Sequence, residues 1–313
     1  MSRIHDALKQ AEQERTGTPR ADFGPKAAAV SPAAAGIAER EQPAGGAGVS
    51  VLPAVQEAVP FTGPLTIETL LARCPVSQWK PDPSRLLPAS PQGFSLGSEE
   101  FRTLRSKLYQ SRETKPLRTI LITSAMPQEG KTFVAANLAQ AIVRQRERRA
   151  LLIDADLRWS RLHQSLGTRL SPGLTEYLRG EADELAIMQR GPVENLFFIP
   201  GGRSAPNAAE LIANGRFQTL LARLGPIFDW VILDSPPAIA MSDASLMADF
   251  CDGVLLVVAA GKTPFDMAQK TREIFRQKNL LGVVLNRVQP GSTDSHYYYG
   301  YYDQSGEKKK AKR

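Results

Sequence analysis

The sequence predicts an α/β fold, in which a doubly wound and mostly parallel sheet is covered by helices on both faces. Several short runs are apolar throughout, which is typical of strands that are buried on both sides. Helical stretches separate these runs, and such alternation indicates the crossover connections of a parallel sheet. None of the runs reaches the ~18 apolar residues of a membrane helix. The expected strands are Thr119–Thr123, Ala150–Asp154, Leu196–Ile199, Trp230–Asp234, Val254–Ala259 and Gly282–Leu285.

The expected helices lie before and between these strands. The first, Ser98–Tyr109, is predicted to begin with Ser98 as its N-cap. Its first turn carries Glu99 and Glu100, and carboxylates are favourable there because they face the positive end of the helix dipole. The other expected helices are Lys131–Arg144, Asn207–Leu224, Ser242–Phe250 and Phe265–Lys278.

Composition divides the 313-residue chain into four parts. Residues 1–15 have apolar positions at helical spacing and are expected to form a docking helix, because so short a helix is marginal unless it folds against a partner. Residues 16–94 are expected to be a disordered tether rich in Ala, Pro and Gly, followed by a lead-in that could not be assigned. Residues 95–290 hold the alternating pattern and form the predicted folded domain. Residues 291–313 are expected to be a flexible tail.

Cysteine content and charge limit the setting of the protein. The two cysteines, Cys74 and Cys251, lie far apart, which does not fit a disulfide framework and favours a reducing cytosol. The N-terminus lacks an apolar signal-peptide core, so a soluble protein made without export is expected. A net charge of +7 permits attraction to phosphates or an anionic membrane but identifies neither. No recognition helix or aromatic–basic motif supports nucleic-acid binding.

A glycine-lysine-threonine loop is the strongest local signal. The run from Ala125 to Thr132 follows the first expected strand and opens the Lys131–Arg144 helix, which is the context that a phosphate-binding Walker A loop requires. Backbone amides of such a loop converge on phosphate oxygens, while the lysine supplies charge and the threonine hydroxyl binds Mg²⁺. The sequence therefore predicts ATP and Mg²⁺ as ligands. The expected nucleotide-binding residues here are Ala125, Gln128, Glu129, Gly130, Lys131 and Thr132.

Carboxylates stand at the ends of two other expected strands. Asp154 and Asp156 follow one strand, and Asp234 ends another. Ligands of open α/β sheets bind beyond the carboxyl ends of the strands, so these side chains should face the same crevice as the loop. Asp234 fits a Walker B carboxylate that holds Mg²⁺, whereas Asp154 and Asp156 fit a second pair, one of which accepts a proton from an attacking hydroxyl. The predicted metal ligands are thus Thr132, Asp154 and Asp234, and the predicted catalytic residues are Lys131, Asp154, Asp156 and Asp234.

Taken together, these motifs resemble those of the bacterial tyrosine kinases, or BY-kinases, of the ParA/MinD-like branch of the P-loop NTPases. The three motifs are Ala125–Thr132, Ile153–Arg158 and Leu233–Pro236, and the resemblance extends from about Ser95 to Tyr302. It implies a protein-tyrosine autokinase in which Lys131 and Mg²⁺ stabilise the transferred γ-phosphoryl group of ATP. It also implies that Arg158 contacts phosphate or holds the aspartates, and that Asn286 contacts the base.

Two further features are similar to features of this family. The spacing Glu99-x-x-Arg102-x-x-Arg105 places alternating charge along one flank of a helix, and in the family such a pattern closes a ring of subunits. The tail contains five tyrosines in six residues, which the resemblance identifies as phosphate acceptors in trans. They are Tyr297, Tyr298, Tyr299, Tyr301 and Tyr302.

The resemblance also carries expectations about partners and place. A standalone autokinase of this type pairs with a membrane chain-length-determinant protein, is opposed by a tyrosine phosphatase, and regulates polymerisation and export of an exopolysaccharide or capsule. We therefore expect a cytoplasmic protein that is peripheral at the inner face of the membrane. The alternative is a ParA/MinD-type ATPase switch without kinase activity. Such switches carry a second lysine early in the loop, where this chain has Met126, and they lack the tyrosine tail.

Overall fold

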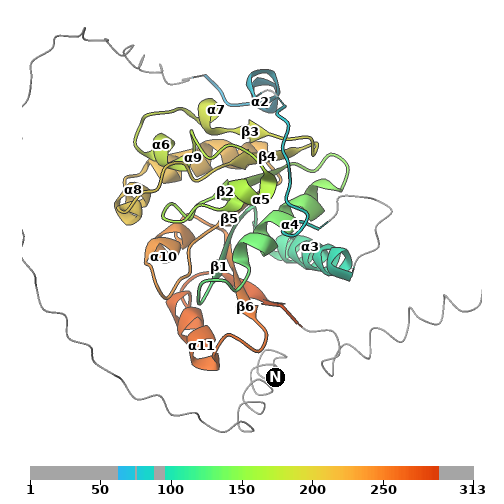
Figure 1. Cartoon of the computed structure of the whole chain (residues 1–313), viewed down its shortest axis with the longest axis vertical. Coiled ribbons are helices and arrows are strands. Elements are labelled where there is room, and N and C mark those ends of the chain that lie inside the picture. Colours follow the sequence, from blue (N-terminus) through green and yellow to red (C-terminus); the bar gives the residue numbers. More distant parts are fainter. Residues whose placement is uncertain (1–62, 75, 88–95, 289–313) are drawn as a thin grey trace, which may run out of the picture. The chain divides into compact units, whose positions relative to one another are not determined.

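The computed structural model describes residues 63–74, 76–87 and 96–288 (Figure 1). The predicted docking helix at residues 1–15, most of the predicted tether and the tail at residues 291–313 lie outside these described residues. Within the described part of the chain, no helix is long and apolar enough to cross a membrane.

A seven-stranded sheet forms the centre of the fold, with the strand order β3-β4-β2-β5-β1-β6-β7. All neighbouring strands run parallel except β3 and β4, which are antiparallel. The chain therefore passes from β1 to β2, β3 and β4 on one side, returns to β5 between β2 and β1, and continues to β6 and β7 on the other side. The predicted doubly wound, mostly parallel sheet is confirmed. The strands are β1 (Thr119–Ser124), β2 (Ala150–Asp154), β3 (Gln189–Arg190), β4 (Leu196–Ile199), β5 (Trp230–Asp234), β6 (Gly253–Ala259) and β7 (Leu280–Asn286).

Helices cover both faces of the sheet, and each face has its own apolar core. One core joins the sheet to α6, α8, α9 and α10, and the other joins it to α3, α4 and α5. The helices are α2 (Ile67–Arg73), α3 (Leu96–Thr114), α4 (Lys131–Val143), α5 (Leu162–Leu166), α6 (Leu174–Leu178), α7 (Glu184–Ile187), α8 (Ala208–Ala213), α9 (Arg216–Leu224), α10 (Asp243–Ala248) and α11 (Phe265–Ile274), with the short 3₁₀ helix η2 (Gly225–Ile227).

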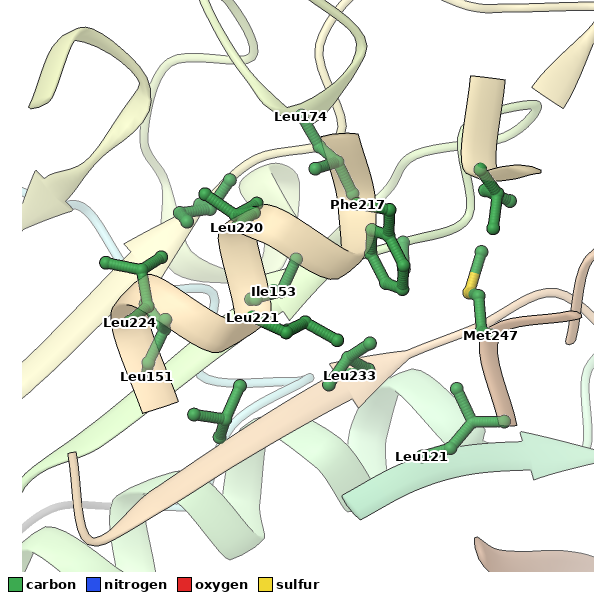
Figure 2. Close-up of a cluster of buried hydrophobic side chains, with 14 of the residues drawn as sticks. Leu121, Leu151, Ile153, Leu174, Phe217, Leu220, Leu221, Leu224, Leu233 and Met247 are labelled. Carbon is green, nitrogen blue, oxygen red and sulfur yellow. The ribbon is translucent and has the colours of Figure 1, made fainter. Parts of the chain in front are cut away.

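Figure 2 shows how α9 packs on the first of these cores. The helix presents Phe217, Leu220, Leu221 and Leu224, all buried, toward the sheet. This i, i+3, i+4, i+7 spacing makes one apolar stripe along a helix. The stripe faces apolar side chains from three neighbouring strands, so α9 is held by burial rather than by helix propensity. These strand residues include Leu121, Leu151, Ile153 and Leu233.

The predicted helix Asn207–Leu224 is two helices, α8 and α9. Gly215 separates them and has a φ of +83°, a left-handed conformation that costs glycine little and other residues about 1–2 kcal/mol. Ser98 also differs from expectation, because it lies buried inside α3 instead of capping its start. Both errors concern helix ends, which apolar periodicity alone does not fix.

The folded region extends further toward the N-terminus than the predicted boundary at residue 95. Leu70 of α2 is buried in one core, while Trp79 and Leu86 are buried in the other. Trp79 packs edge-to-face on Phe198 of β4. These few large side chains are spread among prolines and polar residues, so the segment shows no periodicity although it is part of the core.

Candidate active site

The loop from β1 to α4 has the backbone shape that a phosphate-binding loop needs. Gly130 is the N-cap of α4 and has a φ of +97°. Gln128 also takes a left-handed φ, of +66°, which stores local strain because the residue has a side chain. The amides at the start of α4 consequently lie at the carboxyl end of the sheet, where a helix N-terminus favours anions.

Hydrogen bonds brace this loop from inside and from β7. The buried carboxylate of Glu129 accepts the N–H of Met126 at 2.7 Å and also accepts the hydroxyl of Thr263. The side-chain amide of Asn286 donates to the Glu129 carbonyl at 2.8 Å. Asn286 thus contacts the loop backbone, and its predicted contact with a base stays a prediction. The sequence offered no sign of Thr263, because its link to the loop depends on the fold.

We expect Gly130→Ala to destabilise the protein by about 2–3 kcal/mol, from left-handed strain and the loss of one hydrogen bond. A Cβ at Gly130 would come within 2.0 Å of the Asn286 amide nitrogen. Gly215→Ala is the matched control, since its φ is also positive but a Cβ there meets nothing within 4 Å. Urea unfolding measures both variants. Equal losses for the two would contradict the collision with Asn286.

Lys131 lies between two of the predicted carboxylates. Its Nζ is 3.3 Å from Asp156 Oδ2 and 3.9 Å from Asp234 Oδ1. Burial opposes the charge on the ammonium, but Asp234, Asp156 and Asp154 together raise the pKa of Lys131 above its ordinary value. The lysine is therefore charged at neutral pH and is held at the start of α4, where a phosphate would lie.

Asp154 holds the loop that follows β2. Its Oδ2 accepts the Ser160 hydroxyl at 2.6 Å and the Leu162 N–H at 3.0 Å, and its Oδ1 accepts the Asp156 N–H at 3.3 Å. Burial, with the nearby charge of Asp234 as the next cause, raises the pKa of Asp154 to about 7. Burial likewise raises the pKa of Asp234 to about 6, although Lys131 and the Thr132 hydroxyl act in the opposite direction.

These two raised pKa values predict that stability falls as pH rises. The folded protein binds protons on Asp154 and Asp234 that the unfolded chain, with a carboxyl pKa near 3.8, has released. This contribution is complete below pH 3.8 and is lost as pH passes through 6 to 7. Between pH 5 and 8 we expect the free energy of unfolding to fall on the order of 2–4 kcal/mol. Urea unfolding along this pH series tests it, and a slope unchanged in Asp154→Asn would contradict it.

The residues around Lys131 fit a Mg²⁺ ion that is shared with a nucleotide. Asp234 Oδ1 is buried and has no hydrogen-bond partner, so it is free to accept a metal ion or a metal-bound water. Mg²⁺ prefers few protein carboxylates together with substrate phosphates, and Thr132 and Asp234 supply such a set. Among the described residues, no three or more His, Cys, Asp or Glu side chains form a metal site by themselves. Both oxygens of Asp154 already accept hydrogen bonds, so its role as a ligand stays a prediction.

Arg158 bonds to a carboxylate outside the three aspartates of the site. Its Nε and Nη2 donate to the two oxygens of the buried Asp243, at 2.8 and 3.2 Å, and its Nη1 donates to the Pro206 carbonyl at 2.6 Å. This pair joins the loop after β2 to α10 and to the segment before α8. A contact of Arg158 with phosphate stays a prediction. Asp243 was not predicted because an acidic residue at a helix start normally indicates only a cap.

The charged flank of α3 is engaged within its own subunit. Arg102 Nη1 and Glu99 Oε2 form an exposed ion pair at 2.9 Å. Arg105 Nη1 donates to the Ala141 carbonyl near the end of α4 at 2.6 Å. The negative end of the helix dipole also favours a cation at this place. The role of Glu99, Arg102 and Arg105 in closing a ring stays a prediction. The five predicted acceptor tyrosines lie outside the described residues.

The fold and this site define a class: a P-loop NTPase domain, whose loop, lysine and aspartates gather at the carboxyl ends of β1, β2 and β5. Residues 120–307 match the family described as the CobQ/CobB/MinD/ParA nucleotide binding domain. The chain belongs to this family of nucleotide-binding domains.

Relatives narrow the class. The chain is 34% identical over 210 residues to the tyrosine-protein kinase YwqD of Bacillus subtilis, which covers 66% of this chain and 87% of the relative. It is 34% identical to the tyrosine-protein kinase CpsD of Streptococcus agalactiae, covering 68% of this chain and 92% of the relative. The tyrosine-protein kinase wzc of Salmonella typhimurium is 32% identical over 66% of this chain, which spans only 29% of that longer relative.

Solved structures agree with these relatives. The kinase domain of Escherichia coli tyrosine kinase ETK is similar with a TM-score of 0.61 and 31% identity, over 66% of this chain and 81% of that one. The chimerical protein CapA2B2 is similar with a TM-score of 0.62 and 30% identity, over 72% of this chain and 98% of that one. The chain therefore belongs to the bacterial tyrosine-protein kinase family, as its three Walker motifs predicted, and it is a protein-tyrosine kinase.

Proposed function

We propose that this kinase is an autokinase that transfers the γ-phosphoryl group of ATP to the tyrosine cluster of its own C-terminal tail. The observation that carries the proposal is the position of Lys131, which lies 3.3 Å from Asp156 and 3.9 Å from Asp234 at the start of α4. This arrangement combines a phosphate-binding charge with a carboxylate that can receive a proton. The five tyrosines at positions 297–302 supply acceptors within the same chain.

Each part of the site has a role in this reaction. The amides of Gly130, Lys131 and Thr132 bind phosphate oxygens, and the Lys131 ammonium stabilises the charge that spreads over the transferred group. Mg²⁺, held by Thr132 and Asp234, would neutralise the charge of the β- and γ-phosphates when it is bound. The phenolic oxygen forms a bond to the γ-phosphorus while the bond to the β–γ bridging oxygen breaks and ADP leaves.

Asp156 is the proposed acceptor of the phenolic proton. Asp154 is fully buried and accepts three hydrogen bonds within its own loop, from the Asp156 amide, Ser160 and Leu162, so we assign to it the role of holding the loop. One oxygen of Asp156 faces Lys131 and the other accepts the Trp159 N–H at 3.1 Å. A nearby carboxylate assists the reaction because the ordinary pKa of a phenol is ~10.

The wider context follows from the resemblance to standalone autokinases. We infer that transfer occurs in trans within a ring, in which Glu99, Arg102 and Arg105 of α3 contribute to the subunit contact. The proposed partners are a membrane chain-length-determinant protein and a tyrosine phosphatase. The proposed process is regulation of exopolysaccharide or capsule polymerisation and export at the inner face of the membrane. Phosphate groups on the tail would add negative charge and weaken the ring.

Mass spectrometry tests the central proposal. The purified protein is incubated with ATP and Mg²⁺ beside a Lys131→Met variant. The expected result is phosphate on the tail tyrosines that is absent from the variant. ATP consumption with an unmodified tail would instead favour an ATPase switch, the second reading that this fold allows. Full activity of tail-truncated kinase toward itself would contradict the assignment of the acceptors.

A further inference from the structure

We propose that Trp159, with Met126 and Ile239, forms an apolar rim that receives the aromatic ring of the acceptor tyrosine. The inference rests on the proposed function and names the substrate contact of that site. These three side chains are among the large apolar residues of the described chain that remain exposed. They come from three different loops, each of which directly follows a strand that carries one of the phosphate-site motifs.

Hydrogen bonds fix these loops beside one another. Strands β2, β5 and β1 are neighbours, with Asp234 opposite both Asp154 and Ile122. The N–H of Ala238 donates to the Ser124 carbonyl at 2.8 Å, which ties the segment before Ile239 to the start of the loop that contains Met126. The three loops therefore leave the sheet at one edge, which is the carboxyl edge where Lys131 meets Asp156.

Trp159 is linked most directly to the reacting groups. Its backbone N–H donates to Asp156 Oδ1 at 3.1 Å, and the other oxygen of Asp156 lies 3.3 Å from Lys131 Nζ. Its side chain is nevertheless 61% exposed, whereas Trp79 and Trp230 are 6% and 0% exposed. Those two indoles pack edge-to-face on Phe198 and Tyr109. A large aromatic surface left open beside the proton acceptor is suited to contact another ring.

The tyrosine cluster of this chain is the occupant that fits. The chain leaves the described structure after Val288, and Asn286 is bonded to the phosphate loop itself. An extended chain spans about 3.3–3.6 Å per residue, so the stretch from Asn286 to Tyr297 can cover on the order of 40 Å. Under the proposed transfer in trans, the occupant is the tail of an adjacent copy, and this length gives that tail its reach. An aromatic contact beside the acceptor would also explain why the acceptors are tyrosines in a cluster.

In the reaction, the rim holds the ring while the phenolic oxygen attacks. A bond forms from that oxygen to the γ-phosphorus, the bond to the β–γ bridging oxygen breaks, ADP leaves with the bonding pair, and the proton passes to Asp156. The rim makes no contact with phosphate in this scheme. Its loss should therefore weaken peptide binding without changing nucleotide binding.

Peptide kinetics test this separation. The kinase is the full chain with its five tail tyrosines changed to alanine, which removes the internal competitor, and the substrate is a peptide of residues 294–306. We expect Trp159→Ala to raise the KM for the peptide about two- to tenfold, the value of one aromatic contact, with kcat and the affinity for ADP unchanged. Trp159→Phe should restore most of the KM. Leu71→Ala, which alters an exposed apolar residue of α2, is the matched control.

The outcomes are distinct. An unchanged KM, or an equal fall in kcat and ADP affinity, would overturn the inference, the second because it would mean that the indole supports the nucleotide site and not the peptide. A peptide with phenylalanine at every tyrosine should compete with substrate and change the tryptophan emission of the kinase but not that of its Trp159→Ala variant, and a failure to do either would also overturn it. If the kinase with an intact rim consumes ATP but phosphorylates no peptide, the proposed autokinase function itself is contradicted.

Discussion

Replacing Lys131 with methionine is expected to lower the rate of phosphoryl transfer by about 10²–10³-fold, the usual cost of removing one group that stabilises developing charge. The Lys131 ammonium lies within 4 Å of both Asp156 and Asp234. Without it, two buried carboxylates lose the ammonium that offsets their charge beside the incoming phosphates. Methionine keeps much of the length of the side chain, so the loop has little reason to collapse.

Single-turnover transfer from ATP, followed by phosphotyrosine detection, measures this effect. Lys107→Met is the matched control, because Lys107 is exposed on α3 and should change the rate by less than about twofold. Circular dichroism of both variants shows whether the fold is intact. Transfer by Lys131→Met within tenfold of the unsubstituted protein would mean that another group supplies the charge.

Arg158→Ala is expected to destabilise the fold by about 3–5 kcal/mol, because it leaves a buried carboxylate without its partner. Asp243 is buried, and the guanidinium of Arg158 contacts both of its oxygens while also donating to the Pro206 carbonyl. The substitution therefore removes three hydrogen bonds, which join the loop after β2 to α10 and to the segment before α8. Little solvent reaches Asp243 to replace them.

Urea unfolding measures the loss. Arg276→Ala is the control, since the exposed Arg276–Glu273 pair at 3.9 Å should contribute less than about 1 kcal/mol. Combining Arg158→Ala with Asp243→Asn should recover part of the stability, because the buried charge is then gone. Similar losses of unfolding free energy for Arg158→Ala and Arg276→Ala would show that the buried pair stabilises the fold no more than an exposed pair does.

Much of the sheet could be predicted because its strands are apolar on both sides. The runs that end at Asp154 and Asp234 are fully buried, and so short and continuous an apolar run is typical of a strand with both faces covered. The phosphate loop was predictable for a different reason: its glycine, lysine and threonine serve one purpose at fixed spacing. Both signals are local in the sequence, so neither required the fold.

The rest depends on contacts between distant segments. Thr263 meets Glu129, and Asp243 meets Arg158, only because the sheet brings their loops to one edge. The segment around Trp79 has no periodic pattern, yet the indole of Trp79 packs on Phe198 of β4. Sequence patterns report which way a residue faces within its own element. They carry no information on which residue of another element it meets.

Asn286 links the C-terminal end of the described chain to the phosphate loop. The residue ends the last strand, and its side chain is bonded to the back of the phosphate loop. A pull on the chain beyond Val288 therefore reaches that loop through a short stretch of backbone and one hydrogen bond. A displacement of Asn286 would therefore also displace the phosphate loop, because one side-chain hydrogen bond joins the two.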